Sequence, residues 1–496
     1  MAMAAALITH IGVQKHEPTA LQAVCAGVLA NIGLFTRLAI TGARSLTSLL
    51  KLLAYVDVVY ILSLTVSIIV YRIFLHPLRS FPGPVGASVS KFWTVRIHLD
   101  GEYHRKLREL HKQYDDFVRV GPRELDINNV EAIPAIYGHT SKCRKGPCVS
   151  AVNEFEDYLL HHVNGFLDRL HMSKGKEDIS WLFTHFSFDI MGELAFGRSF
   201  DMIQSGHAHQ FMITLHKFMH SLSLLSAIPW MTSLLRLLPV SAEIKMFQDF
   251  AEDCVQERVA NSSPRRDLFH FLLGEDKETG SKLTRAQLVQ ESRTAIAGGS
   301  DTSSITLGCL FYYLVRHQDK YRILQAEIAQ HAGRAPENGW LGALPYLNAC
   351  INEALRLMPP VPQGLQRQTP PAGLQIGDHW IPGNTLVGVS PFVIQRDARY
   401  FSNPDAFVPE RWLDDAPPES FVKQAWIPFT IGTYSCVGKQ FALSELRHVT
   451  FAVVRDFDME FAEGFDADQF EFSVKNDFVL TPPSVMVNIR SRRQSN

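Results

Sequence analysis

A cysteine near the C-terminal end of the chain stands in a loop whose residue types suit chemistry. Residues 428–442 read PFTIGTYSCVGKQFA, which puts Cys436 between two glycines and ahead of a lysine. Three functions fit such a cysteine: the turn of a phosphate-binding loop, a nucleophile, or a thiolate that binds a metal. A phosphate loop ends in Gly-Lys followed by Ser or Thr, but Gln440 occupies that place, and the spacing from Gly432 to Gly438 is one residue too long.

The nucleophile and the metal ligand make different demands on the neighbouring residues. A nucleophilic cysteine needs a base beside it, and His448 lies too far along the same expected helix. A cysteine at the start of a helix is favoured as a thiolate by the helix dipole. Gly432 and Gly438 let the backbone turn sharply against a flat ligand, and Phe429 can pack beside the sulfur. These features suit a thiolate that binds a metal such as haem iron, but this short motif alone favours a buried structural cysteine in a glycine turn, and other motifs must decide between the two.

A second motif, AGGSDTSS at residues 297–304, lies inside a long expected helix. Gly298 and Gly299 each cost about 1 kcal/mol in a helix interior relative to alanine, so something should compensate for them. A groove for a small ligand such as O2 would do so, and Asp301 and Thr302 beside it form an acid–alcohol pair that can relay protons. The alternative is a close helix crossing.

A third motif, EALR at residues 353–356, puts Glu353 and Arg356 on one helix face. Such a pair is usually a surface ion pair that contributes little to stability. The segment FVPERW at residues 407–412 adds Arg411.

These motifs together resemble a known family. The segment FTIGTYSCVG is similar to the haem-binding signature F-x-x-G-x-x-x-C-x-G of the cytochromes P-450, and the other motifs follow in that family's order. The resemblance runs from FPGP at residues 81–84 to the last strand, and it is greatest for fungal microsomal members. It implies Cys436 as the axial iron ligand and Asp301 with Thr302 in oxygen activation. It also implies that Glu353, Arg356 and Arg411 form a structural lock.

The resemblance also assigns residues to the haem propionates, and here the chain departs from the pattern twice. Arg367, in PQGLQR, matches a propionate-binding position. Position 434, usually Arg or His, is Tyr434, which brings no positive charge. Between residues 146 and 152 the chain lacks some tens of residues, including a W-x-x-x-R. A truncated gene model, a splice form and a degenerate protein would each explain that gap.

The elements that must position these residues are mostly helical. Helices are expected at residues 102–114, 152–170, 180–197, 283–317 and 344–358 and from about Cys436 to Arg455, and short strands at 117–127 and 374–390. Thr284 and Gln287 form a capping box at the start of the longest helix. The expected fold is mainly α with small β-sheets, the cytochrome P-450 fold.

The N-terminal part differs in composition from the rest. Residues 19–36 carry no charge and residues 52–71 carry only Asp57, and each run is about long enough to cross a bilayer. We expect residues 1–76 to be a membrane anchor region with one or two hydrophobic segments, and residues 77–496 to be the catalytic domain. Arg72 and Arg79 predict a cytosolic body, and the resemblance implies the endoplasmic reticulum.

Composition supports this assignment and excludes one class of partner. The formal net charge of −2 provides no basic surface for nucleic acid. Seven scattered cysteines argue against a disulfide framework.

The sequence as a whole predicts a haem-dependent monooxygenase that oxidises a hydrophobic small molecule, by resemblance a fungal secondary metabolite. Because no dinucleotide fingerprint is present, the resemblance implies electrons from NADPH through a flavoprotein reductase, with Lys439 and Arg447 at its docking face. Two alternatives remain open: a haem-thiolate isomerase or dehydratase, and a non-catalytic or haem-deficient membrane protein of the same fold.

Overall fold

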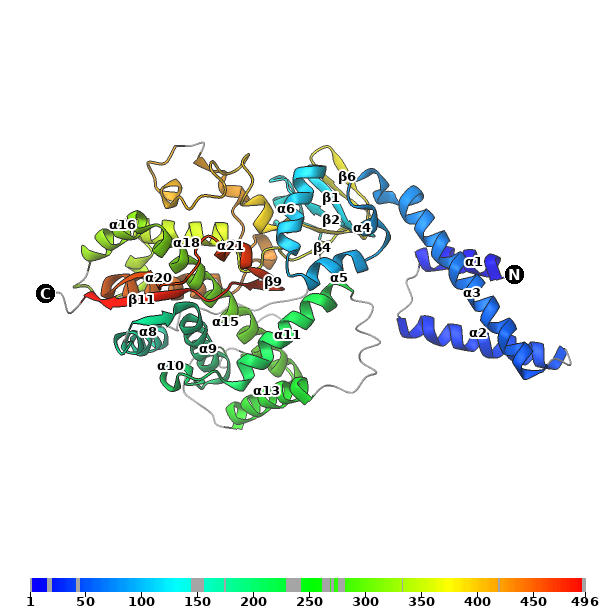
Figure 1. Ribbon diagram of the computed structural model, residues 1–496, viewed down its shortest axis with the longest axis horizontal. Coiled ribbons are helices and arrows are strands. Elements are labelled where there is room, and N and C mark those ends of the chain that lie inside the picture. The colour runs from blue at the N-terminus through cyan, green and yellow to red at the C-terminus, as the bar shows by residue number, and fades with distance from the viewer. Residues whose placement is uncertain are drawn as a thin grey trace.

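The computed structural model places a large mixed body at one end and three N-terminal helices at the other, with the two termini at opposite ends of the long axis (Figure 1). The structure describes residues 2–15, 20–41, 45–143, 156–173, 175–228, 242–260, 268, 272–274, 282–331, 333–417 and 420–492.

Helices dominate the described residues. They are α1 Ala2–Lys15, α2 Ala20–Thr41, α3 Leu46–Val70, α4 Val85–Val89, α5 Phe92–Leu99, α6 Tyr103–Tyr114, α7 Ala132–Tyr137, α8 Glu156–His171, α9 Ile179–Phe196, α10 Met202–Ser205, α11 Gln210–Ala227, α13 Ala242–Ala260, α15 Arg285–Arg316, α16 Gln318–Ala329, α17 Asn338–Leu341, α18 Pro345–Leu357, α19 Pro391–Ile394, α20 Lys439–Asp456 and α21 Phe470–Ser473.

The strands are short and form four small sheets. They are β1 Phe117–Gly121, β2 Glu124–Ile127, β3 Lys176–Asp178, β4 Arg367–Gln368, β5 Leu374–Ile376, β6 His379–Ile381, β7 Leu386–Gly388, β8 Phe457–Phe461, β9 Lys475–Asp477, β10 Val479–Thr481 and β11 Met486–Ser491. The sheets have the orders β1-β2-β7-β4, β3-β11-β8, β9-β10 and β5-β6. In the largest sheet only the β2–β7 pair is parallel.

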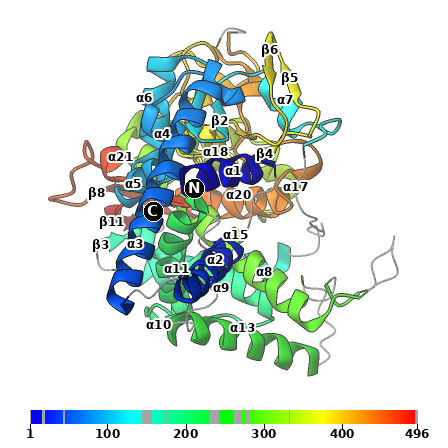
Figure 2. The same cartoon turned by 90° about the vertical axis from the view of Figure 1, so that its right-hand side faces the viewer.

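Helix α3 contacts both α1 and α2, and the three helices lie in front of the body in Figure 2. Two stretches, Leu21–Ile40 and Leu46–Leu75, are long and apolar enough to cross a membrane. The second stretch contains the expected run 52–71 and extends beyond it at both ends, whereas the first covers residues 21–36 of the expected run 19–36 and continues to Ile40. Asn31 of α2 donates a hydrogen bond of 3.2 Å to Asp57 of α3, so the single acidic residue of the second run has a partner in the first.

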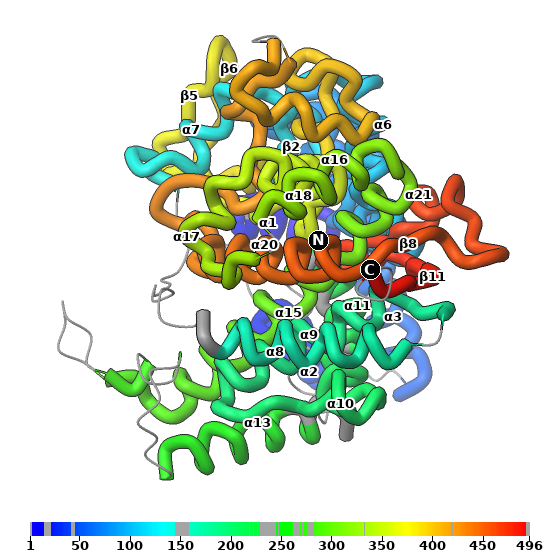
Figure 3. The backbone as a smooth tube through the Cα atoms, turned by 90° about the vertical axis from the view of Figure 1, so that its left-hand side faces the viewer, coloured from blue at the N-terminus to red at the C-terminus, as the bar shows by residue number. Residues whose placement is uncertain are grey.

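The core of the body is built around α15, which lies with α18 and α20 between the α8–α10 and α13 helices and the largest sheet (Figure 3). One large apolar cluster joins residues of α9, α15, α18 and α20. The N-terminus of α15 is fixed by the predicted capping box, in which Thr284 and Gln287 exchange hydrogen bonds. A long helix that is largely buried from Ser300 onwards thus forms the scaffold for residues 297–304.

Most of the expected elements are confirmed with shifts of a few residues at their ends: α6, β1, β2, α9, α15, α18 and the strands β5–β7. Helix α8 confirms the expected helix from residue 156 onwards, and residues 152–155 lie outside the described part. The expected start of the last helix at Cys436 was wrong, because α20 begins at Lys439. The N–H of Cys436 turns back to the carbonyl of Phe429 at 2.9 Å, which keeps the cysteine in the preceding loop.

Candidate functional site

Cys436 lies in a tight loop directly before α20. The loop contains a single 3₁₀ turn, Gly432–Tyr434, and Gly438 caps the helix that follows. The side chain of Cys436 is exposed. A cysteine in front of a helix N-terminus is favoured as a thiolate and as a metal ligand.

Gly432 is required by two features of this loop. Its φ of 76° lies in the left-handed region that glycine adopts without strain. A Cβ atom at this position would lie 1.9 Å from the carbonyl oxygen of Tyr137, the last residue of α7. The loop therefore approaches the backbone of α7 as closely as only a glycine permits. Gly438 is less constrained, since its Cβ would meet only Cys436 Sγ, at 3.9 Å.

Arg367 is buried beside this loop with part of its guanidinium unused. Its side chain is 2% exposed, and its Cζ lies 5.2 Å from the ring centre of Tyr137 and 5.5 Å from that of Tyr434. Nη1 donates to the carbonyls of Leu365 and Gln366. Nε and Nη2 are buried and have no hydrogen-bond partner among the described residues. Such donors are costly to leave unpaired, and a carboxylate ligand would satisfy them.

The glycines of α15 have two different environments. A Cβ on Gly298 would meet nothing within 4 Å, whereas one on Gly299 would lie 2.6 Å from Sδ and Cε of Met191 on α9. Gly298 thus agrees with the expected groove, and Gly299 agrees with the alternative of a close helix crossing. Thr302, one turn after Gly298, donates its hydroxyl hydrogen to the Gly298 carbonyl at 2.7 Å.

Asp301 is the buried member of the expected acid–alcohol pair, with its side chain 5% exposed. Its Oδ1 lies 2.9 Å from Nε2 of His216 on α11. Its Oδ2 is buried without a hydrogen-bond partner among the described residues. No local pattern in the sequence marks His216 as its neighbour, because 85 positions separate the two residues.

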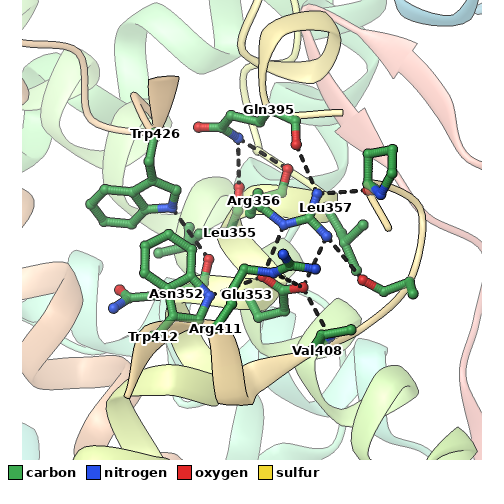
Figure 4. Close-up of polar contacts among 12 residues, drawn as sticks. Asn352, Glu353, Leu355, Arg356, Leu357, Gln395, Val408, Arg411, Trp412 and Trp426 are labelled. Carbon is green, nitrogen blue, oxygen red and sulfur yellow. Dashed lines mark hydrogen bonds and ion pairs between the residues drawn. The ribbon is translucent and has the colours of Figure 1, made fainter. Parts of the chain in front are cut away.

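The expected lock of Glu353, Arg356 and Arg411 forms in full (Figure 4). Glu353 accepts two hydrogen bonds from Arg356, at 2.8 and 2.9 Å, and one from Arg411 at 3.1 Å. The indole N–H of Trp412 donates to the same carboxylate at 2.9 Å. The interpretation as an ordinary surface pair is wrong for this site, since Glu353 and Arg356 are both fully buried.

Packing brings the elements of the two motifs into one region. Helices α15 and α20 contact each other. Phe441, in the first turn of α20, packs against an apolar cluster that contains Met191 and Ile296. The region thus combines the Cys436 loop, the Asp301–Thr302 pair and the unused donors of Arg367. This combination suits a protein that binds a flat, anionic, iron-containing group through a thiolate.

Comparison with known proteins gives the family. The chain belongs to the cytochrome P-450 family, whose model matches residues 140–489. The cytochrome P-450 monooxygenase FCK2 of Fusarium pseudograminearum is 33% identical, over 87% of this chain and 85% of the relative. Tryprostatin B 6-hydroxylase of Aspergillus fumigatus is 32% identical, over 85% of this chain and 82% of the relative. The protein is therefore a cytochrome P-450 monooxygenase.

Two further comparisons concern length and fold. Cytochrome P-450 67 of Uromyces fabae is 30% identical over 98% of both chains. The crystal structure of cytochrome P-450DA heme domain has a TM-score of 0.59 with 20% identity and covers 69% of this chain and 72% of its own. That likeness supports the mainly helical fold with small sheets.

The residues fit the haem that the family implies. Cys436 can supply the thiolate, the unused donors of Arg367 suit a propionate, and Gly438 leaves the space beside Cys436 Sγ open, since a Cβ there would lie 3.9 Å from the sulfur. Phe429 contacts the cysteine through its backbone, and its ring lies 5.8 Å from Nζ of Lys439. Arg447 bonds to Asn348 and Asn338 at 2.7 and 3.0 Å, so this predicted docking residue already has partners within the protein.

Proposed function

We propose that the chain oxidises a hydrophobic small molecule of secondary metabolism, using O2 and electrons that a separate NADPH-dependent flavoprotein reductase delivers. The names of several similar fungal proteins support the substrate class, since one of them is a hydroxylase of tryprostatin B. The observation that carries the proposal is the Cys436 loop. It contains the family's signature, forms a glycine turn before α20, and lies beside the buried donors of Arg367.

Each functional residue has a defined task in this proposal. Haem, when bound, supplies the oxygen chemistry. Cys436 would hold the iron, and Phe429 would keep the cysteine in its loop through the bond from the Cys436 N–H to the Phe429 carbonyl. Arg367 binds a propionate through Nε and Nη2, and Tyr434 adds its ring and at most one hydrogen bond. Thr302 and Asp301, on α15, would hold and move the protons that oxygen reduction consumes.

We further propose that residues 1–76 anchor the protein in the endoplasmic reticulum membrane, with the body in the cytosol. Two apolar helices of sufficient length support an anchor. Arg72 and Arg79, directly after the second helix, support the orientation.

One experiment addresses the reaction and the anchor together. The full chain and a chain without residues 1–76 are expressed with a fungal flavoprotein reductase and incubated with hydrophobic compounds selected by their shift of the haem absorption band. We expect oxidised product only when NADPH is supplied, and we expect the full chain alone to sediment with membranes. Product without NADPH would instead identify an isomerase or dehydratase, and a truncated chain that still sediments would contradict the anchor.

A further inference from the structure

A histidine on a neighbouring helix contacts the carboxyl group of the proposed proton relay. His216 lies on α11, which runs beside the middle of α15 and between α5 and α13 (Figure 1). Its Nε2 is 2.9 Å from Oδ1 of Asp301. The His216 side chain is 42% exposed and that of Asp301 is 5% exposed. The pair therefore links a solvent-accessible imidazole to a buried carboxyl group.

We propose that His216 is a positioning residue that acts through Asp301: it orients the carboxyl group and passes protons to it from solvent. The proposal rests on the proposed role of Asp301 in the relay. The proposal adds a route for protons from bulk water to Asp301, which Asp301 and Thr302 do not provide by themselves.

The orientation of Asp301 supports this role. With Oδ1 bonded to His216, Oδ2 remains buried and has no partner among the described residues. A buried oxygen without a hydrogen-bond partner destabilises the folded protein. A contact that served only to dock α11 would not explain why this oxygen is left unpaired. A carboxyl group that takes a proton on Oδ1 and then turns about its Cβ–Cγ bond to deliver it must not be held in place by a bond at Oδ2.

A second histidine–aspartate pair on α11, His220 with Asp477, makes a contact that only packs the helix against the body. His220, one turn after His216, lies 2.8 Å from Oδ1 of Asp477 on β9. The other oxygen of Asp477 accepts a hydrogen bond of 3.2 Å from Thr481. Both oxygens of this carboxylate are thus used, and its side chain is 20% exposed. His220 therefore offers a matched control with the same chemistry and without the relay.

The charges around His216 favour its protonated form. Burial by itself lowers the pKa of His216, but the hydrogen bond to Asp301 and the charge of that residue outweigh burial, and the pKa ends above its ordinary value. Asp301 is the charged group that acts on this pKa. The elements that contact α11 also carry other ionisable side chains, among them Arg96 and His98 on α5, Lys245, Asp249, Glu252, Asp253, Glu257 and Arg258 on α13, and Lys475 and Asp477 on β9.

The proton balance of the step is simple. The imidazolium gives the proton on Nε2 to Oδ1 of Asp301, and the ring keeps the proton on Nδ1. The carboxyl group then turns about its Cβ–Cγ bond and gives this proton to the oxygen that is being reduced, which returns Asp301 to the carboxylate. The ring then turns out of the contact about its Cβ–Cγ bond and takes a new proton on Nε2 from water. No described residue hydrogen-bonds to Nδ1, so no bond within that part of the chain holds this side of the ring.

The test uses the haem-loaded full chain in membranes with a flavoprotein reductase, NADPH and air, without organic substrate. The reading is the ratio of water to hydrogen peroxide formed per NADPH between pH 6 and 9. Without a proton donor, peroxide leaves before the oxygen–oxygen bond breaks. We expect His216→Gln and Asp301→Asn to lower the ratio about tenfold, which is modest beside the rate effect of about 10²–10⁴-fold for a positioned acid. The wild-type ratio should fall as pH rises through the pKa of His216.

The control variants separate the possible outcomes. His220→Gln should keep the wild-type ratio and pH dependence, and His216→Lys, which keeps a charged donor, should restore the ratio at neutral pH. If Asp301→Asn and Thr302→Ala both leave the ratio unchanged, the proposed function of this pair fails. If those two variants lower it but His216→Gln behaves like His220→Gln, the inference about His216 alone is overturned.

A second reading does not depend on turnover. Histidine titration followed by NMR in the ¹⁵N-labelled protein should place the pKa of His216 above its ordinary value. Asp301→Asn should lower that pKa, and Asp477→Asn should leave it unchanged. Equal titration of His216 in the wild type and in Asp301→Asn would show that the contact does not form and would also overturn the inference.

Discussion

At the residue scale, the position of Arg367 between two tyrosine rings is the feature that distinguishes this site from the usual pattern of the family. Tyr434 stands where family members usually carry a basic residue, so one positive charge at the proposed propionate site is absent. Arg367 keeps two buried N–H groups without partners among the described residues, and the rings of Tyr137 and Tyr434 lie within about 6 Å of its guanidinium carbon. We infer that Arg367 alone neutralises the propionate.

Replacing this arginine should therefore weaken haem binding more than folding. Arg367→Leu removes a charged hydrogen-bond donor that contributes on the order of 1.5–3 kcal/mol, which corresponds to roughly 10- to 100-fold in haem affinity. The haem-free protein should lose little stability, because Nε and Nη2 make no bonds to described residues and Nη1 bonds only to the carbonyls of Leu365 and Gln366, the two preceding residues. Haem transfer to excess apomyoglobin and thermal unfolding of the haem-free form measure the two quantities. Arg367→Lys is the control that keeps the charge, and unchanged haem retention in Arg367→Leu would contradict the assignment.

At the element scale, the carboxylate of Glu353 connects α18 to the segment that precedes the cysteine loop. Arg356 donates to the carbonyls of Gln395, Pro404 and Ala406 at 2.7, 2.6 and 2.9 Å. Because Glu353 is fully buried, its removal would leave a buried guanidinium without its counter-charge. A buried ion pair is strongly destabilising to break from one side, even where the intact pair contributes little.

A buried and an exposed Glu–Arg pair with the same i,i+3 spacing allow a direct test of how burial affects the contribution of Glu353 to stability. Glu353→Gln should lower the free energy of unfolding by about 3–5 kcal/mol, as expected for an unpaired buried charge. Glu102→Gln breaks the pair with Arg105, whose two side chains are 58% and 25% exposed, and should cost less than about 1 kcal/mol. Denaturant unfolding of both variants gives the comparison. Similar losses in the two variants would show that burial does not determine the contribution of Glu353.

The sequence predicts those elements whose signals are local. The capping box of Thr284 and Gln287 marks the start of α15 because the interaction spans three residues. The contacts of Glu353 with Arg411 and of Asp301 with His216 join residues 58 and 85 positions apart. The first was predicted only because a family motif links its members, and the second has no motif and was missed. The start of α20 was placed too early because the turn at Cys436–Lys439 depends on a backbone bond to Phe429.

At the scale of the whole molecule, the chain is shorter than its relatives within the aligned region. The alignment with the Uromyces fabae protein extends over 541 positions, although this chain has 496 residues. The relative therefore has residues without a counterpart here. We predicted such a gap between Gly146 and Val152, a stretch that lies outside the described residues.

This gap leads to a prediction about the two possible forms of the protein. The 496-residue form should bind haem weakly and form little product relative to a form that carries the segment, because the gap that we predict would remove a distal propionate arginine, at a cost on the order of 1.5–3 kcal/mol. A transcript with an additional in-frame segment that contains W-x-x-x-R should encode a form with full haem occupancy. Transcript sequencing and haem content per polypeptide test this prediction. Full occupancy and coupled turnover in the short form would contradict it.

The central claim, that Cys436 binds haem iron as a thiolate, is tested most directly by the absorption spectrum of the haem-loaded protein, reduced and under carbon monoxide. We predict a red-shifted Soret band of the thiolate type for the wild-type chain. The band should persist in Cys350→Ala, since Cys350 is fully buried in the core, and should disappear in Cys436→Ala. A band that survives in Cys436→Ala, or that is lost equally in both variants, would contradict the account.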